Sequence, residues 1–162
     1  MAFLARSAAF VTAHPRWCAL GLGAVAALGF RPLALWPLTL LALAGLIQLT
    51  ARAATARQAA LIGWLFGLAH FTIGDFWIAT AFTYQANMPA WLGAIAVVLL
   101  SLYLALYPLL AVLAAWLTAR RAPIALTLAF AGWWIVAEWL RAWVFTGFAW
   151  NPLGVVLLAG YD

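Results

Sequence analysis

The residues of this chain that combine reactive chemistry with a suggestive spacing lie between Trp133 and Gly154. Glu138 and Arg141 are three positions apart, so an α-helix would place the acid and the base on one face, close enough to pair. Two interpretations of this pair stay open. It is either an ion pair that anchors the end of a membrane helix, or Arg141 faces an anionic headgroup or a partner domain while Glu138 holds its orientation.

The turn that follows, TGFAWNP, is the most irregular stretch of the chain. Its glycine permits backbone angles that other residues resist, and its proline prevents a helix from continuing. Two large aromatic side chains and a hydroxyl group are thus displayed on non-helical backbone, which a membrane tolerates only against protein, water or headgroups. We expect either the wall of a lipid-access portal or a plain interfacial loop. The candidate wall residues are Glu138, Arg141, Thr146, Gly147, Phe148, Trp150 and Asn151.

Two further ionisable residues, His70 and Asp75, lie inside the apolar run Gln58–Phe82. Ionisable groups in a membrane segment are costly and therefore suggest function. Their spacing of five does not place them on one helix face, so a hydrogen-bonded helix contact, or an interfacial position for Asp75, is the alternative. We find no metal-binding His/Cys cluster, no phosphate-binding glycine loop and no nucleophile–base set, and these residues alone do not identify an enzyme.

The composition excludes a soluble domain. Of 162 residues, 70% are hydrophobic and 7% are charged, whereas soluble domains average about 45–50% and about 25%. The net charge of +5 comes from arginines that stand singly or in pairs between apolar runs. This is the pattern of cationic membrane-protein loops, and it lacks the clustered basic face of a nucleic-acid-binding protein.

The apolar runs predict an all-α fold, a polytopic transmembrane helix bundle of about five helices plus the start of another, in one domain over residues 1–162. The first two runs are short for a membrane span and should meet in a tight hairpin at the prolines between them. The fourth run should be kinked by its internal Pro108. The predicted helices are Trp17–Phe30, Leu35–Thr50, Gln58–Phe82, Ala90–Thr118, Pro123 to about Ala142, and a beginning at Val155–Ala159.

The distribution of arginines predicts the orientation in the membrane. With the N-terminus in the cytoplasm, only Arg31 and Arg141 lie outside, which follows the positive-inside tendency. The end of the Trp133–Gly154 stretch is then extracytoplasmic. The arginines placed inside are Arg6, Arg16, Arg52, Arg57, Arg120 and Arg121.

Four motifs resemble the membrane part of bacterial apolipoprotein N-acyltransferases. EWLRAWVFTGFAWNPLG at 138–154 is the most specific of them. The others are FWIATAFTYQANMP at Phe76–Pro89, LYLALYP at Leu102–Pro108 and RPLALWPL at Arg31–Leu38. They occur in the order and spacing of the family and cover nearly the whole chain.

The resemblance implies a multi-pass enzyme of the bacterial cytoplasmic (inner) membrane that acts in lipoprotein biosynthesis. Such an enzyme moves an acyl chain from a phospholipid, typically phosphatidylethanolamine, to the α-amino group of the diacylglyceryl-cysteine that begins an apolipoprotein. The transfer proceeds through a thioester on a cysteine, with a Glu-Lys-Cys set in an extracytoplasmic nitrilase-like domain. A thiolate of lowered pKa takes the acyl group and splits the transfer into two easier steps. No cofactor is implied.

The sequence departs from the family pattern at its end. It stops where the family continues into the nitrilase-like domain, it contains no Lys, and its one cysteine, Cys18, lies in the first apolar run. We therefore expect a membrane fragment that has no catalytic residue and is inactive alone, with phospholipid, apolipoprotein and membrane lipids as partners. The alternative is a stand-alone bundle that serves as a small transporter or assembly scaffold.

Overall fold

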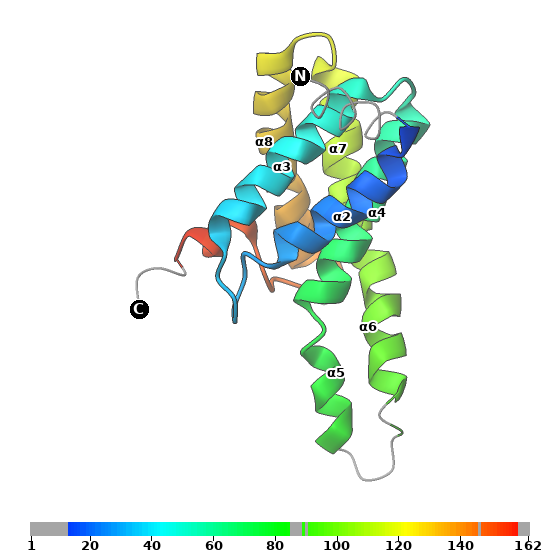
Figure 1. The fold of residues 1–162 in the computed structure, drawn as a ribbon, viewed down its shortest axis with the longest axis vertical. Helices are drawn as coiled ribbons and strands as arrows, with labels where there is room; N and C mark the ends of the chain where they lie inside the picture. The colour runs from blue at the N-terminus through cyan, green and yellow to red at the C-terminus, as the bar shows by residue number, and fades with distance from the viewer. Residues whose placement is uncertain (1–12, 85–88, 90, 146, 159–162) are drawn as a thin grey trace, which may run out of the picture.

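The computed structural model describes residues 13–84, 89, 91–145 and 147–158, and every regular element in these ranges is helical (Figure 1). The all-α prediction is confirmed for this part of the chain. The α-helices are α2 (Pro15–Ala27), α3 (Trp36–Arg52), α4 (Ala56–Gly74), α5 (Ile78–Ala81), α6 (Trp91–Leu104), α7 (Leu106–Ala119) and α8 (Pro123–Trp143). Two 3₁₀ helices, η1 (Phe82–Tyr84) and η2 (Leu153–Leu158), complete the set.

The first two helices form the predicted hairpin. A proline stands in the first turn of both α2 and α3, where its missing N–H group costs no intrahelical hydrogen bond. The Thr39 hydroxyl donates to the carbonyl of Ala26 at 2.8 Å and ties the two helices together near the hairpin.

The predicted single helix over Gln58–Phe82 is interrupted. Helix α4 ends at Gly74, and the chain continues through α5 and η1 at an angle of 46°. Glycine is a poor helix former, and the next residue, Asp75, turns its carboxylate toward a segment far along the chain. Helices α5 and α6 then project together beyond the rest of the bundle (Figure 1).

The proline kink occurs slightly earlier than predicted. The helix breaks at Ala105, between α6 and α7, three positions before Pro108. A proline clashes with the carbonyl four residues earlier and has no N–H group to bond to it, which here affects Leu104. The distortion therefore lies on the N-terminal side of the proline.

The prediction of about five membrane spans is only partly supported. By length and composition, two helical stretches are long and apolar enough to cross a membrane, Trp91–Ala119 and Pro123–Trp143. A third qualifies if α4 is counted together with the bent segment Ile78–Tyr84. The sequence-based count was higher because it included the short helices α2 and α3.

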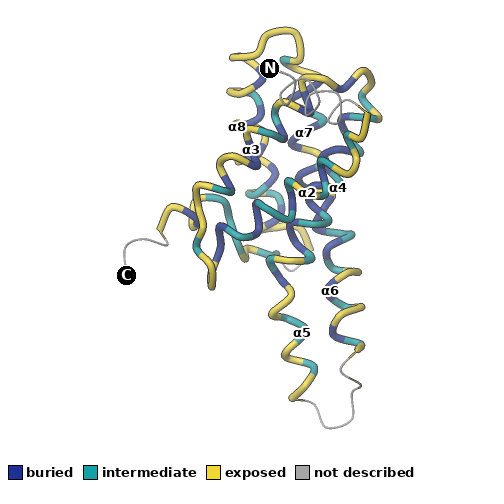
Figure 2. Tube along the Cα trace, viewed as in Figure 1, coloured by how far each residue is buried: buried dark blue, intermediate teal, exposed yellow. Residues whose placement is uncertain are grey.

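Helix α4 lies at the centre of the packing, against α2 on one side and α7 on the other. Buried residues follow these contacts, whereas α5 and most of α6 are exposed or half-buried (Figure 2). Gly63 and Gly67 form a Gly-x-x-x-Gly pair on the α7 side, an arrangement that lets membrane helices approach closely. A Cβ atom on Gly63 would lie 2.7 Å from the carbonyl oxygen of Pro108.

We predict that Gly63→Ala lowers the free energy of unfolding by about 1–3 kcal/mol, because the added methyl group forces α4 away from α7 backbone. Gly132→Ala is the matched control, since Gly132 is also helical and has open space where its Cβ would be. Thermal unfolding in detergent measures both. Equal effects at the two positions would contradict the close contact between α4 and α7.

Candidate functional site

The backbone after α8 folds back onto the helix end. Val144 adopts extended geometry, and Phe145, Gly147 and Asn151 all have positive φ. At Gly147, where φ is 75°, a Cβ atom would come within 2.3 Å of a carbonyl oxygen of the last helical turn, so only glycine fits. The N–H group of Phe148 donates to the Arg141 carbonyl at 2.8 Å and closes the turn.

Arg141 is buried and holds this returning segment from the inside. Only 3% of its surface is exposed. Its Nη1 donates to the carbonyl oxygen of Trp150 at 2.7 Å, and its guanidinium lies 5.2 Å from the ring centre of Phe71 on α4. A charge-assisted hydrogen bond of this length is strong and directional. The buried guanidinium therefore binds the returning segment and is not exposed to a headgroup at the molecular surface.

Glu138 completes the attachment from one helical turn earlier. Its Oε1 accepts hydrogen bonds from the backbone N–H of Leu153 at 2.7 Å and from the indole N–H of Trp134 at 3.1 Å. The same oxygen is 4.0 Å from Nη2 of Arg141, so the predicted ion pair exists but is long. The two charged side chains thus hydrogen-bond the backbone of Trp150 and of Leu153, on either side of Asn151 and Pro152. We call Glu138 and Arg141 the α8 clamp.

Asn151 connects the clamped segment to the end of α4. Its Nδ2 donates to Oδ1 of Asp75 at 3.0 Å and to the carbonyl of Gly74 at 3.4 Å. Asp75 is fully buried. Of the two alternatives to a functional role that the sequence left open for Asp75, a hydrogen-bonded contact and an interfacial position, its surroundings correspond to the hydrogen-bonded contact.

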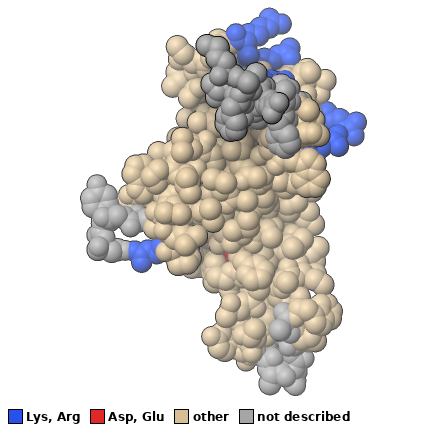
Figure 3. All heavy atoms as spheres, viewed as in Figure 1, with Lys and Arg blue, Asp and Glu red and all other residues tan. Residues whose placement is uncertain are grey.

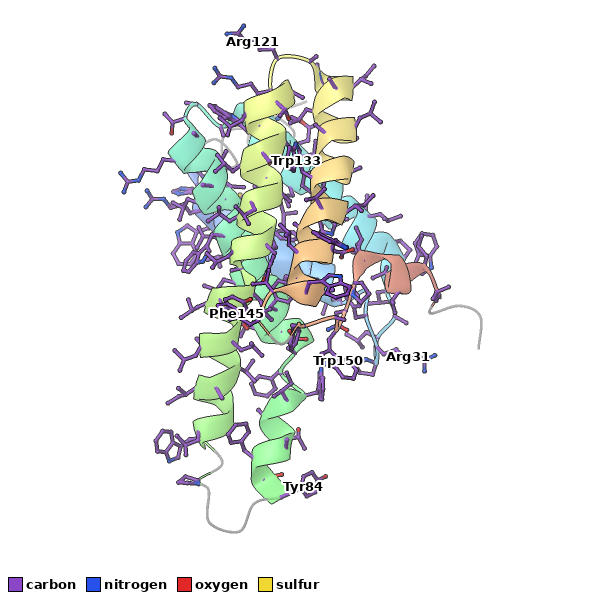
Figure 4. All side chains as sticks on the ribbon, turned by 180° about the vertical axis from the view of Figure 1, so that it is seen from behind. Arg31, Tyr84, Arg121, Trp133, Phe145 and Trp150 are labelled. Carbon is purple, nitrogen blue, oxygen red and sulfur yellow. The ribbon has the colours of Figure 1, made fainter. Side chains whose placement is uncertain are left out.

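Trp150 faces outward from the clamped backbone. It is 60% exposed, and its ring packs edge-on against Trp77, which follows the end of α4, with 5.5 Å between ring centres. Figure 4 shows Trp150 on the same side of the molecule as Arg31 and far from Arg121. Phe148 is half-buried against the core. Thr146, also a predicted wall residue, lies outside the described residues.

A groove of about 530 Å³ runs beside the two tryptophans. It is lined by residues 29–31 of the hairpin, by Trp77, and by residues from Trp150 to Leu158. Its walls are mostly apolar, with the cation of Arg31 among them. The sequence pattern did not reveal this groove, because the hairpin, the end of α4 and the clamped segment are far apart along the chain.

His70 occupies an apolar setting behind the clamp. Its ring stacks on Phe66 at 5.9 Å between centres and lies edge-on to Phe30 and Phe71. A cavity of about 20 Å³ beside it is lined also by both clamp residues, which is room for a single water molecule and none for a headgroup. Within the described ranges, His70 Nδ1 and Asp75 Oδ2 are buried without a hydrogen-bond partner.

The hydrogen bonds of Glu138, Arg141 and Asn151 shape a surface at the end of α8. Over the described part of the chain, no group of three or more His, Cys, Asp or Glu residues is placed to hold a metal ion. Glu138 and Arg141 hydrogen-bond the backbone of the returning segment. At the surface beside this segment lie the Trp77–Trp150 pair and the groove.

Comparison with known proteins identifies the domain. Residues 22–161 match the family model described as the apolipoprotein N-acyltransferase N-terminal domain. Curated apolipoprotein N-acyltransferases are similar over most of this chain: that of Ralstonia nicotianae is 42% identical over 150 residues, and that of Nitrosomonas europaea 38% over 139 residues. These alignments cover 86% and 84% of this chain.

The same alignments cover much less of the relatives, 28% and 27% of their respective lengths. The enzyme of Vibrio cholerae agrees, at 35% identity over 82% of this chain and 26% of its own length. The match includes the α8 clamp and the segment that it holds, since both lie within residues 22–161. The chain belongs to the apolipoprotein N-acyltransferase family, and the part of the family that it matches is the N-terminal domain.

Proposed function

We propose that this chain is the membrane part of an enzyme that transfers an acyl chain from a phospholipid to the N-terminal diacylglyceryl-cysteine of apolipoproteins. The observation that carries the proposal is the family match over residues 22–161, which contains the α8 clamp and the Trp77–Trp150 pair. In this proposal, residues 1–162 form a transmembrane domain, and the Glu-Lys-Cys chemistry belongs to a nitrilase-like domain outside this chain. Residues 1–162 by themselves are inactive.

We assign the wall of the lipid path to the groove beside Trp150. Its volume and apolar lining suit part of an acyl chain. Trp77 and Trp150 are exposed amphipathic rings of the kind that gather where hydrocarbon meets headgroups. The clamp residues, with Gly147 and Asn151, act as positioning residues that hold Trp150 at the boundary between hydrocarbon and headgroups.

We further propose that the chain lies in the bacterial inner membrane with its N-terminus in the cytoplasm. Arginine side chains gather at one end of the molecule (Figure 3), where Arg16, Arg57, Arg120 and Arg121 line surface grooves. The positive-inside tendency assigns that end to the cytoplasm. The Trp150 groove then opens at the outer leaflet, on the side where apolipoproteins are modified.

A stand-alone transporter is less well supported. The cavity beside His70 holds about one water molecule, and Asp75 is bonded to Asn151 within the fold. Membership of an acyltransferase family also favours a role in lipid handling.

We predict that Trp150→Ala lowers acyl transfer roughly 10-fold in the acyltransferase that carries this domain, because a displaced substrate reacts slowly. Trp143→Ala is the control, since Trp143 is 71% exposed on α8 outside the groove. Transfer is measured with a labelled phospholipid and a diacylated lipoprotein peptide, at equal amounts of membrane-inserted protein. If both variants transfer at the wild-type rate, Trp150 is only an interfacial anchor.

We predict that a membrane-impermeant maleimide labels Phe145→Cys in intact cells and labels Ala122→Cys only after the cells are opened. Both positions are exposed, and they lie at opposite ends of α8. The measurement uses a Cys18→Ser background, which removes the one native cysteine of this chain. The reverse labelling pattern would refute the cytoplasmic N-terminus.

A further inference from the structure

A second groove lies at the opposite end of the molecule from Trp150. It has a volume of about 680 Å³, within the usual range of about 300–1,000 Å³ for small-molecule sites. It lies where the beginnings of α2 and α4 come together, since its lining is drawn from residues 13–17 and 55–62. The site proposed for acyl transfer uses none of these residues.

The two helices that form this groove are packed side by side and run in the same direction. Gly23 of α2 lies so close to α4 that a Cβ atom there would meet the Phe66 carbonyl oxygen at 2.1 Å. Both helix N-termini therefore point out of the same end of the bundle. At the start of α4 the Thr55 hydroxyl already accepts a hydrogen bond from the Gln58 N–H, and the first turn of α2 contains Pro15, which has no N–H group. What both helix ends add is therefore the partial positive charge of the helix dipole.

Two arginines strengthen this positive potential. Arg16 and Arg57 both line the groove and are exposed. Among the described residues, the acids are Asp75 and Glu138, and neither lines this groove. A negatively charged group therefore meets two guanidinium groups and two helix N-termini, with no described carboxylate in the lining to oppose it.

The groove also has an apolar side. Leu61 and Ile62 of α4 contribute to its lining, and Trp17 at its edge is 69% exposed. An exposed tryptophan next to arginines is typical of the level where acyl chains meet headgroups. The groove thus combines cations for a phosphate with apolar surface for the adjoining hydrocarbon.

We propose that this groove binds one anionic phospholipid, with the phosphate between Arg16 and Arg57 and the start of an acyl chain against Leu61 and Ile62. A zwitterionic phospholipid fits less well, because its ammonium group would be repelled by the same arginines. The bound lipid fastens α2 to α4 at this end of the bundle. The proposal does not depend on acyl transfer, since the groove is at the other end of the molecule from the Trp150 surface.

The test is a lipid titration of the detergent-purified protein, followed by native mass spectrometry. The wild type should bind phosphatidylglycerol at least 10-fold more tightly than phosphatidylethanolamine, an order-of-magnitude expectation from about 1 kcal/mol per basic residue. The double variant Arg16→Gln/Arg57→Gln should lose roughly 30-fold of its affinity for phosphatidylglycerol on the same basis. Arg16→Lys/Arg57→Lys keeps both charges and should retain most of the affinity.

The matched control is Arg120→Gln/Arg121→Gln, which removes the same charge from another groove at the same end of the molecule. Arg120 there is stacked on Trp116, with its guanidinium carbon 4.1 Å from the ring centre. This control should bind phosphatidylglycerol as the wild type does. An equal loss in both double variants would mean unspecific attraction to a basic surface and would overturn the proposal. So would equal wild-type affinity for the two lipids, or no binding of either, as expected if another part of the chain fills the groove.

Discussion

The structure depends on satisfying backbone polar groups where helix α8 ends inside an apolar protein. A helix bonds its own N–H and C=O groups, but the Trp150 carbonyl and the Leu153 N–H lie beyond the end of α8 and its closing turn. Glu138 and Arg141 supply what is missing, with a carboxylate oxygen on the Leu153 N–H and a guanidinium on the Trp150 carbonyl. An unpaired buried polar group costs about 1–3 kcal/mol, so each of these partly buried bonds helps to keep the segment against the bundle.

The break in α4 belongs to the same arrangement. Asp75 and Asn151 are 76 residues apart in sequence, yet the amide of one bonds to the carboxylate of the other. This contact joins the end of α4 to the clamped segment and brings Trp77 against Trp150. The exposed tryptophan pair thus follows from the partly buried hydrogen bond between Asn151 and Asp75. The bent α4–α5 connection and the turn after α8 form one structural unit. Gly63 and Gly67 let α4 lie close against the start of α7.

Helix ends and turns were predictable from the sequence, whereas the contacts between residues far apart along the chain were not. The hairpin of α2 and α3 and the extent of α8 follow from apolar runs bounded by prolines, which act on their own neighbours. The bend after Gly74 was missed, because its cause includes a hydrogen bond from Asn151 that no local pattern records. Arg141 was recognised as special from its type and spacing, but its buried orientation depends on Trp150 folding back. The Gly63–Gly67 pair is a local sequence signal of close helix packing that hydropathy alone does not record.

Hydrogen–deuterium exchange of residues 144–158 tests the clamp most directly. Replacing Glu138 by Leu removes the acceptor of the Leu153 N–H, so exchange over this segment should become faster than in the wild type by roughly 5- to 150-fold, as expected for a loss of about 1–3 kcal/mol. Exchange in α2 and in the first turns of α4 should stay unchanged. If the segment keeps its wild-type protection in Glu138→Leu, the clamp does not hold it, and the central claim is contradicted.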